Sequence, residues 1–110
     1  MQITIRKSGA TTILDLRGAL MIGDSELEFR QKIKGLMDSG VRNLAINLSG
    51  VPDMDSWGLG SLVRHGTKVR KSGARCIFFG TVPRVLRLLK IAKLDSVLDL
   101  AETESDALSR

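Results

Sequence analysis

Few residues of this chain could build a disulfide, a metal cluster or a membrane span. The 110 residues include a single cysteine, Cys76, which excludes an internal disulfide and a cysteine-rich zinc site. They include a single histidine, His65, which leaves little material for a metal cluster. No apolar run approaches the roughly 20 residues that cross a bilayer, and the N-terminus lacks the apolar core of a secretory signal. We therefore expect a cytoplasmic protein with no metal site and no membrane insertion.

The length and composition suit one globular domain over residues 1–110. Hydrophobic residues make up 43% of the chain and charged residues 26%, an ordinary globular balance. Single domains cluster near roughly 100–150 residues, and a chain of this size buries enough surface to fold without a disulfide or a metal. Internal repeats, linkers and low-complexity segments are absent.

Acidic side chains are missing from residues 56–94, which carry nine basic ones. Residues 1–55 hold seven of each sign, and residues 95–110 hold five acidic side chains and one basic one, for a formal net charge of +5. A basic stretch of this kind can bind nucleic acid, acidic lipid or an acidic protein. Solvated helix faces are the commoner explanation, so nucleic acid is not the partner that we expect.

The first part of the chain is predicted to form a hairpin and a helix. Two short β-prone runs, at 3–5 and 13–16, are separated by Ser8-Gly9-Ala10, a pattern typical of a hairpin. A helix is expected to follow, with Asp24 or Ser25 as its N-cap. Four apolar residues then recur at the spacing of one buried helix face: Phe29, Ile33, Leu36 and Met37.

The rest of the chain alternates between strands and helices. Apolar runs at 44–48 and 76–79 predict strands buried on both faces, with a helix between them that begins near Ser56. Pro83 suits the first turn of a third helix. Residues 97–100 fit a last short strand, and residues 101–110 form a short helix or fray. The β-β-α-β-α-β-α-β order predicts an α/β fold, with helices packed on a mixed, mostly parallel sheet of four to five strands.

The densest group of chemistry-bearing residues is the segment from Asp53 to Gly60, DMDSWGLG. The segment lacks the ligand spacing of a calcium loop, the third glycine of a dinucleotide loop and the lysine of a phosphate loop. A serine hydrolase would need a base for Ser56. His65 is the one histidine available, but it lies roughly 13 Å away on the opposite side of the predicted helix. We therefore expect no enzyme activity, and we expect His65 to face solvent.

Two interpretations of this segment stay open from the residues alone. In the first, Asp55 or Ser56 caps a helix, and Gly58 and Gly60 allow a tight turn and close packing. In the second, Ser56 is exposed and can be phosphorylated. A phosphate adds about −1.5 to −2 charges, which the N–H groups and dipole of a helix N-terminus tolerate. Such a change suits a binding switch.

The segment from Asn47 to Leu62 resembles the signature of STAS domains, above all the bacterial anti-sigma factor antagonists, in which D-S-[S/T]-G-L-G follows a buried strand and opens a helix. Weaker similarity covers residues 16–20, 71–74 and 83–89. The resemblance implies partner switching in transcription regulation. An unphosphorylated antagonist binds an anti-sigma factor that is also a serine kinase, phosphorylation of Ser56 releases it, and a PP2C-type phosphatase restores binding. It implies no catalysis and no cofactor in this chain.

The chain departs from the family pattern at two places that bear on partner binding. Trp57 replaces the usual serine or threonine, and it either anchors a partner or is buried against the preceding loop. The stretch around Met21 and Ile22 is apolar where many members have an acidic residue, which implies a more hydrophobic partner surface. The expected partner-binding residues are Met21, Ile22, Asp55, Ser56, Trp57, Gly58 and Leu59.

Two other functions are weighed against this one. The alternative is a STAS regulatory subunit that docks on a larger assembly, such as a lipid-transport ABC complex. It is motivated by the stripe Arg84, Arg87 and Lys90 and by the apolar Met21-Ile22 pair. A weaker hypothesis is nucleic-acid binding through residues 64–93, which retention on DNA at low salt would test.

Overall fold

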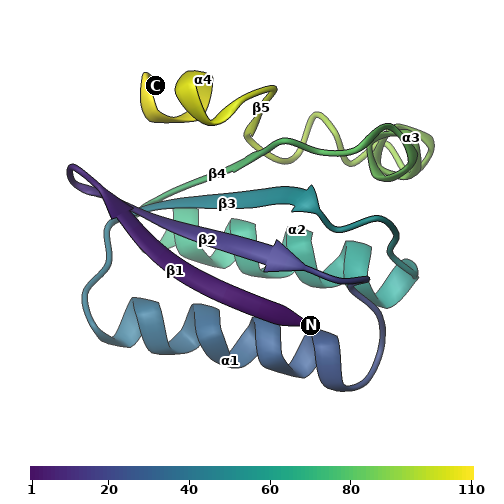
Figure 1. Ribbon diagram of the computed structural model, residues 1–110, viewed down its shortest axis with the longest axis horizontal. Coiled ribbons are helices and arrows are strands. Elements are labelled where there is room, and N and C mark those ends of the chain that lie inside the picture. Colours follow the sequence, from purple (N-terminus) through teal and green to yellow (C-terminus); the bar gives the residue numbers. More distant parts are fainter.

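The computed structural model describes all 110 residues as five strands and four helices (Figure 1). None of the helices combines the length and the apolarity needed to cross a bilayer. In chain order the elements are β1 (Gln2–Ser8), β2 (Thr11–Arg17), α1 (Asp24–Asp38), β3 (Asn43–Gly50), α2 (Ser56–Lys71), β4 (Arg75–Phe79), α3 (Pro83–Ile91), β5 (Leu100–Ala101) and α4 (Glu104–Leu108).

The five strands form one mixed sheet in the order β1-β2-β3-β4-β5. β1 and β2 are antiparallel, and every other neighbouring pair is parallel. The hairpin turn uses Gly9 in the left-handed region, at φ 58°, where a residue without Cβ is favoured. The predicted α/β class, with a mostly parallel sheet, is confirmed.

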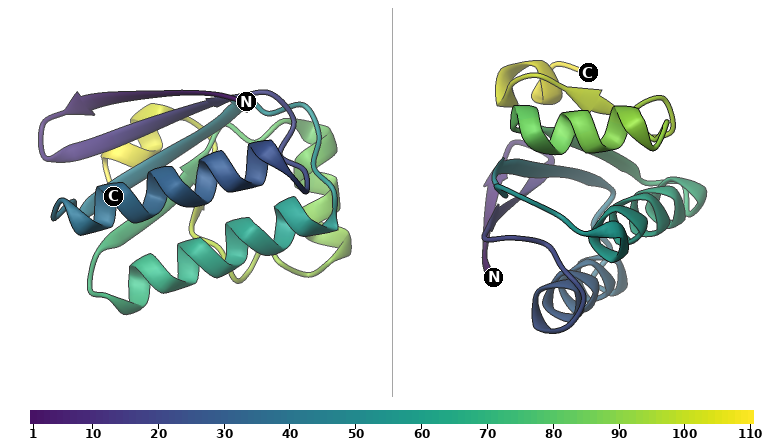
Figure 2. Two further views of the ribbon diagram at one scale, coloured as in Figure 1. Left: turned by 90° about the horizontal axis from the view of Figure 1, so that it is seen from below. Right: turned by 90° about the vertical axis from the view of Figure 1, so that its right-hand side faces the viewer.

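The sheet separates two hydrophobic clusters of unequal size. α1 and α2 lie side by side on one face of the sheet, and α4 lies on the other (Figures 1 and 2). Successive residues of a strand point to opposite faces, so Leu14 joins the larger cluster while Ile13 joins the smaller one. The larger cluster holds 18 buried residues. The smaller one consists of Ile13, Ala45, Ile77, Phe79, Ala101 and Ala107.

Three expectations about element ends are corrected or settled by the structure. The N-cap of α1 is Gly23 rather than Asp24 or Ser25, because the Ser25 hydroxyl is hydrogen-bonded to the backbone of Met21 instead. The last strand covers residues 100–101 rather than 97–100. The C-terminal residues form a helix, capped by the Thr103 side chain, rather than a frayed tail.

The topology brings two loops together at the carboxyl ends of β2 and β3. Leu20, in the loop after β2, forms a β-bridge with Met54, in the loop after β3. The Leu20 N–H also donates to the Asp53 carbonyl oxygen at 3.1 Å. Parallel strands end at the same edge of a sheet, so the loops that follow them become neighbours. The segment that the sequence singles out lies at this edge.

Candidate functional site

Ser56 is the first residue of α2, and its side chain is exposed. The residue before it, Asp55, has extended backbone angles and accepts a hydrogen bond from the Gly58 N–H at 2.8 Å. This is the geometry of an N-cap, which satisfies one of the free N–H groups of the first turn. Of the two predicted caps, the structure selects Asp55, and the Ser56 hydroxyl is left open to solvent.

The Asp55 carboxylate also connects the two loops of the site. Its Oδ1 accepts from Gly58, and its Oδ2 accepts from the Ile22 N–H at 2.9 Å. The hydrogen bonds from Ile22 and Gly58 lower the pKa of Asp55, because they favour its charged form. One ionised side chain therefore holds the loop after β2 against the start of α2.

Gly58 allows the first turn of α2 to lie directly on that loop. A Cβ atom at this position would sit 2.0 Å from the Leu20 carbonyl oxygen, so no side chain fits without movement. The expectation of close packing is confirmed for Gly58. It is wrong for Gly60, where an added Cβ meets nothing within 4 Å and φ is not positive.

Two large apolar side chains are exposed beside Ser56. Ile22 is 67% exposed and Trp57 is 49% exposed. Trp57 is therefore not buried against the preceding loop. Met21 and Leu59 are half-buried, and Leu59 packs against the larger core cluster.

Glu26 is a site residue that sequence reasoning missed. It is 3% exposed, and its carboxylate accepts hydrogen bonds from Trp57 Nε1 at 3.1 Å and from Ser61 Oγ at 3.0 Å. Burial opposes its ionisation, but these bonds and the charge of Arg30, whose Nε lies 3.6 Å away, outweigh burial and lower the pKa of Glu26. Glu26 precedes Phe29 by three residues, so helical spacing placed it on the buried face from the start.

The expectation that His65 faces solvent is wrong. Its side chain is 11% exposed, and its ring meets that of Phe29 edge to face, with centroids 5.8 Å apart. Its Nε2 lies 3.9 Å from Glu26 Oε2 and has no hydrogen-bond partner. Burial, and then the charge of Arg64, lower the pKa of His65. The helical spacing that His65 shares with Leu62 could have revealed this position.

Part of the basic stretch is engaged within the protein. Arg84 Nε lies 3.0 Å from Asp53 Oδ1, and this partner lowers the pKa of Asp53. The Arg64 guanidinium lies 5.9 Å from the centre of the Trp57 ring, within the range of a cation–π contact. Arg70 donates to the Val97 carbonyl oxygen at 3.1 Å. Three of the nine basic side chains of this stretch are thus engaged with different parts of the protein.

Residues 2–107 match the sequence pattern of the STAS domain. The chain belongs to the STAS domain family. The expected family is therefore confirmed, over nearly the full length of the domain just described.

Solved structures share this STAS fold across proteins of different kinds. A candidate anti-sigma factor antagonist from Thermotoga maritima is 22% identical, with a TM-score of 0.87, and the match covers 97% of this chain and 92% of that one. The Bacillus cell-fate determinant SpoIIAA in its phosphorylated form is 21% identical, with a TM-score of 0.72 and coverage of 99% and 98%. The murine anion transporter solute carrier 26 family member A9 is 18% identical, with a TM-score of 0.75, over 91% of this chain and 17% of the transporter. At such identities the likeness establishes the fold.

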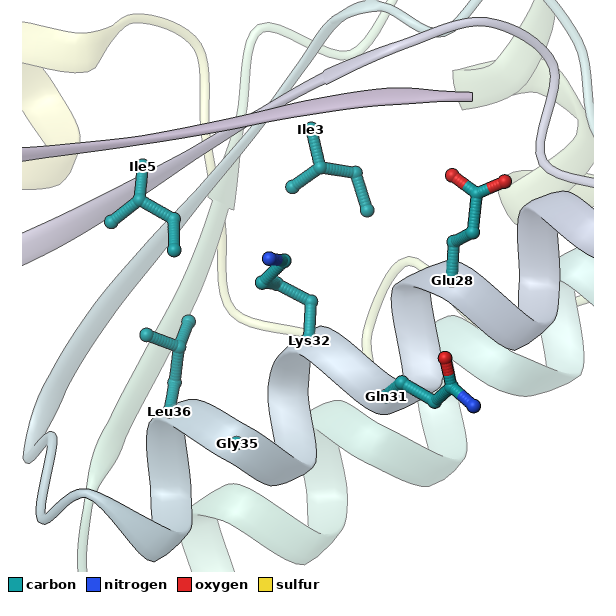
Figure 3. Close-up of a pocket in the computed structure, with 7 residues that line it drawn as sticks. All are labelled: Ile3, Ile5, Glu28, Gln31, Lys32, Gly35 and Leu36. Atoms are coloured by element: carbon teal, nitrogen blue, oxygen red, sulfur yellow. The ribbon is translucent and has the colours of Figure 1, made fainter.

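This STAS domain also has a shallow groove between β1 and α1 (Figure 3). Ile3 and Ile5 point from the strand toward the helix, and Lys32 and Leu36 rise from the helix toward the strand. None of its lining residues belongs to the two loops around Ser56. The structure holds no group of three histidine, cysteine, aspartate or glutamate residues that could bind a metal ion.

Proposed function

We propose that this STAS domain is an anti-sigma factor antagonist that binds an anti-sigma factor with serine kinase activity and is released when Ser56 is phosphorylated. The observation that carries the proposal is the exposed Ser56 at the start of α2, which stands between exposed Trp57 and Asp55, the residue that bonds the exposed Ile22. A phosphorylated form of SpoIIAA, which shares the fold, supports it. The proposal places the protein in the bacterial cytoplasm, in transcription regulation.

The site offers a physical basis for release. Exposed apolar side chains of this size are typical anchors of a protein interface, so Ile22 and Trp57 favour binding of a complementary surface. A phosphate on Ser56 adds about −1.5 to −2 charges next to these side chains. It stands next to the ionised Asp55, and it would have to lose its water on binding. The complex therefore weakens while the helix N-terminus tolerates the charge.

In this proposal the STAS domain is a substrate of its partner and carries out no reaction itself. The Ser56 oxygen forms a bond to the γ-phosphorus of ATP as the bond from that phosphorus to ADP breaks, and a base of the kinase takes the hydroxyl proton. Nucleotide and metal belong to the kinase. A PP2C-type phosphatase reverses the change by hydrolysis of the phosphoserine, which releases inorganic phosphate.

The test uses the purified kinase-type anti-sigma factors of the source genome. Wild-type protein is incubated with each kinase and ATP, phosphate is located by mass spectrometry, and binding is measured for wild type, Ser56→Ala and Ser56→Asp. We expect phosphate on Ser56 alone, retained binding for Ser56→Ala and lost binding for Ser56→Asp. Ser96→Asp, at another exposed serine, is the matched control and should bind as wild type does. Phosphate elsewhere, or full binding by Ser56→Asp, would overturn the proposal.

The second candidate, a docking subunit of a larger assembly such as a lipid-transport ABC complex, rests on α3. Ile91 is 73% exposed, beside the exposed Arg87 and Lys90. The family fold also occurs within a much longer transporter chain. Reversal of charge at Arg87 and Lys90 discriminates between the two. It should abolish docking on an ABC ATPase but leave binding to a soluble kinase unchanged.

A further inference from the structure

We propose that Glu26 is a positioning residue that fixes the orientation of Trp57 beside Ser56 and thereby sets the affinity of the domain for its partner. The inference rests on the proposed function, since it takes Trp57 as a contact of the partner. It adds to that function a residue on a different helix, buried beneath the surface that the partner would touch.

The indole of Trp57 is held on two sides although half of it is exposed. Its Nε1–H donates to Glu26 Oε1 at 3.1 Å, which ties the edge of the ring to α1. The Arg64 guanidinium, from the next turns of α2, lies 5.9 Å from the ring centre. A hydrogen bond at one edge and a cation near one face together define where the exposed part of the ring points.

The carboxylate of Glu26 is itself locked in place. Its second oxygen accepts from the hydroxyl of Ser61, which is 0% exposed. Arg30 approaches from one turn further along α1, at 3.6 Å. Each oxygen of the carboxylate therefore has a defined partner, and Arg30 holds Oε1, the acceptor that Trp57 uses, independently of Ser61.

Packing between α1 and α2 does not by itself require a carboxylate at this position. Replacement of a buried charged network by apolar side chains of similar volume is often neutral or stabilising. The helix face around Glu26 is otherwise apolar, with Phe29 and Ile33 buried beside it. An aliphatic residue here could fill the space between α1 and α2, but it could not accept a hydrogen bond from the indole. The acceptor function is what distinguishes Glu26 from an aliphatic residue.

Orientation of the indole matters because immobilising a side chain at an interface costs about 0.5–1.5 kcal/mol. If Glu26 orders Trp57 in the free protein, the side chain is already immobilised when the partner binds, and binding does not include this free-energy cost. Loss of the acceptor should then weaken binding by about two- to tenfold. This loss of affinity would occur although the substitution removes no atom that the partner touches.

The free protein provides the first measurement, because Trp57 is the only tryptophan and the chain contains no tyrosine. Time-resolved fluorescence anisotropy and the indole N–H resonance report directly on the order of this one side chain. We expect fast local motion of the indole in Glu26→Ala. Glu26→Gln should retain the wild-type signal, since its amide oxygen accepts from Trp57 and its amide nitrogen donates to Ser61. Ser61→Ala is the matched control that removes the other partner of Glu26 and should leave the indole ordered.

The second measurement is affinity for the purified kinase that phosphorylates Ser56. We expect Glu26→Ala to bind about two- to tenfold more weakly, Glu26→Gln to bind as wild type does, and Ser61→Ala to bind as wild type does even where its stability falls. Trp57→Phe, which lacks the indole N–H, should weaken binding, and addition of Glu26→Ala to it should have no further effect. An additive double variant would overturn the proposal.

The two measurements separate failure of this inference from failure of the proposed function. An indole that stays ordered in Glu26→Ala, or that loosens without loss of affinity, overturns the role of Glu26 while leaving the antagonist function intact. Absence of binding by the wild-type protein to any kinase overturns the proposed function and the affinity role together. The fluorescence result would still decide whether Glu26 orients Trp57.

Discussion

Substitution of Gly58 by alanine should separate the two loops of the site. The Cβ of alanine would sit 2.0 Å from the Leu20 carbonyl oxygen and 2.9 Å from its carbon, whereas real Cβ contacts essentially never fall below 3.0 Å. The loop after β2 must therefore retreat by at least about 1 Å, because the atoms in the way are backbone atoms. That movement strains the Leu20 N–H bond to Asp53 and the Ile22 N–H bond to Asp55.

The expected loss of stability is the sum of two destabilising effects, overpacking and weakened hydrogen bonds, and one stabilising effect, the higher helix propensity of alanine. Overpacking of this kind costs about 1–3 kcal/mol, and each weakened hydrogen bond about 0.5–1.5 kcal/mol. The higher helix propensity of alanine offsets at most about 1 kcal/mol of this loss. The net loss is about 1–5 kcal/mol in the free energy of unfolding, with a central value of about 3 kcal/mol, which corresponds to roughly 10 °C or more in Tm for a domain of this size.

Urea unfolding followed by circular dichroism, with Gly60→Ala as the matched control, measures this loss. Gly60 lies two residues further along α2, and a Cβ there meets nothing within 4 Å. Alanine at this position should raise the free energy of unfolding by about 0.5–1 kcal/mol. A Gly58→Ala protein as stable as wild type would refute the argument that the close approach of Leu20 requires glycine.

Three further predictions concern titration, reactivity and charge. Acidification should destabilise the protein, because the folded-state pKa values of His65 and Glu26 are both lowered. The stabilisation that His65 contributes is present above its unfolded pKa near 6.5 and is lost as the pH falls below that value. The stabilisation from Glu26 is lost as the pH falls below about 4.5. Urea unfolding at pH 8, 6, 5 and 4 should show the decrease below pH 6.5 in wild type but not in His65→Gln. Cys76 should resist thiol reagents in the native state, because burial raises its pKa to about 12, and rapid labelling without denaturant would contradict this. Ser56→Asp should keep the wild-type circular dichroism spectrum and a Tm within a few degrees, because a helix N-terminus tolerates negative charge; an unfolded variant would refute a role as a switch.

Hydrophobic spacing predicted most of the fold because the larger core is built from regular patterns. The hairpin, three of the helices and the buried strands β3 and β4 all lie where periodicity and turn residues placed them. β5 was placed too early, since its two residues are held by pairing with β4 rather than by a pattern of their own. Short elements of this kind depend on tertiary contacts that a single sequence does not display.

Only part of the site could be predicted, because local patterns place some of its residues and tertiary contacts place the others. Asp55 and Ser56 follow from rules of helix capping that act over three or four residues. Glu26 and His65 were missed because their polar chemistry pointed to solvent, although their helical spacing put both on buried faces. The contacts of both residues come from the other helix: Trp57 and Ser61 of α2 donate to Glu26, and the His65 ring packs on Phe29 of α1.

The smaller hydrophobic cluster has a consequence for the order in which the nascent chain completes its fold. β1 to β4, α1 and α2 are available once residue 79 has been synthesised, but the smaller cluster on the opposite face of the sheet waits for Ala101 and Ala107. Arg6 then pairs with Glu104, 98 positions further along the chain. Domains are made N-terminal end first, so a ribosome-bound chain presents Ile13 and Ile77 uncovered until Ala101 and Ala107 emerge. A helix of only five residues, α4, thus covers a hydrophobic surface that stays exposed during most of the synthesis of this domain.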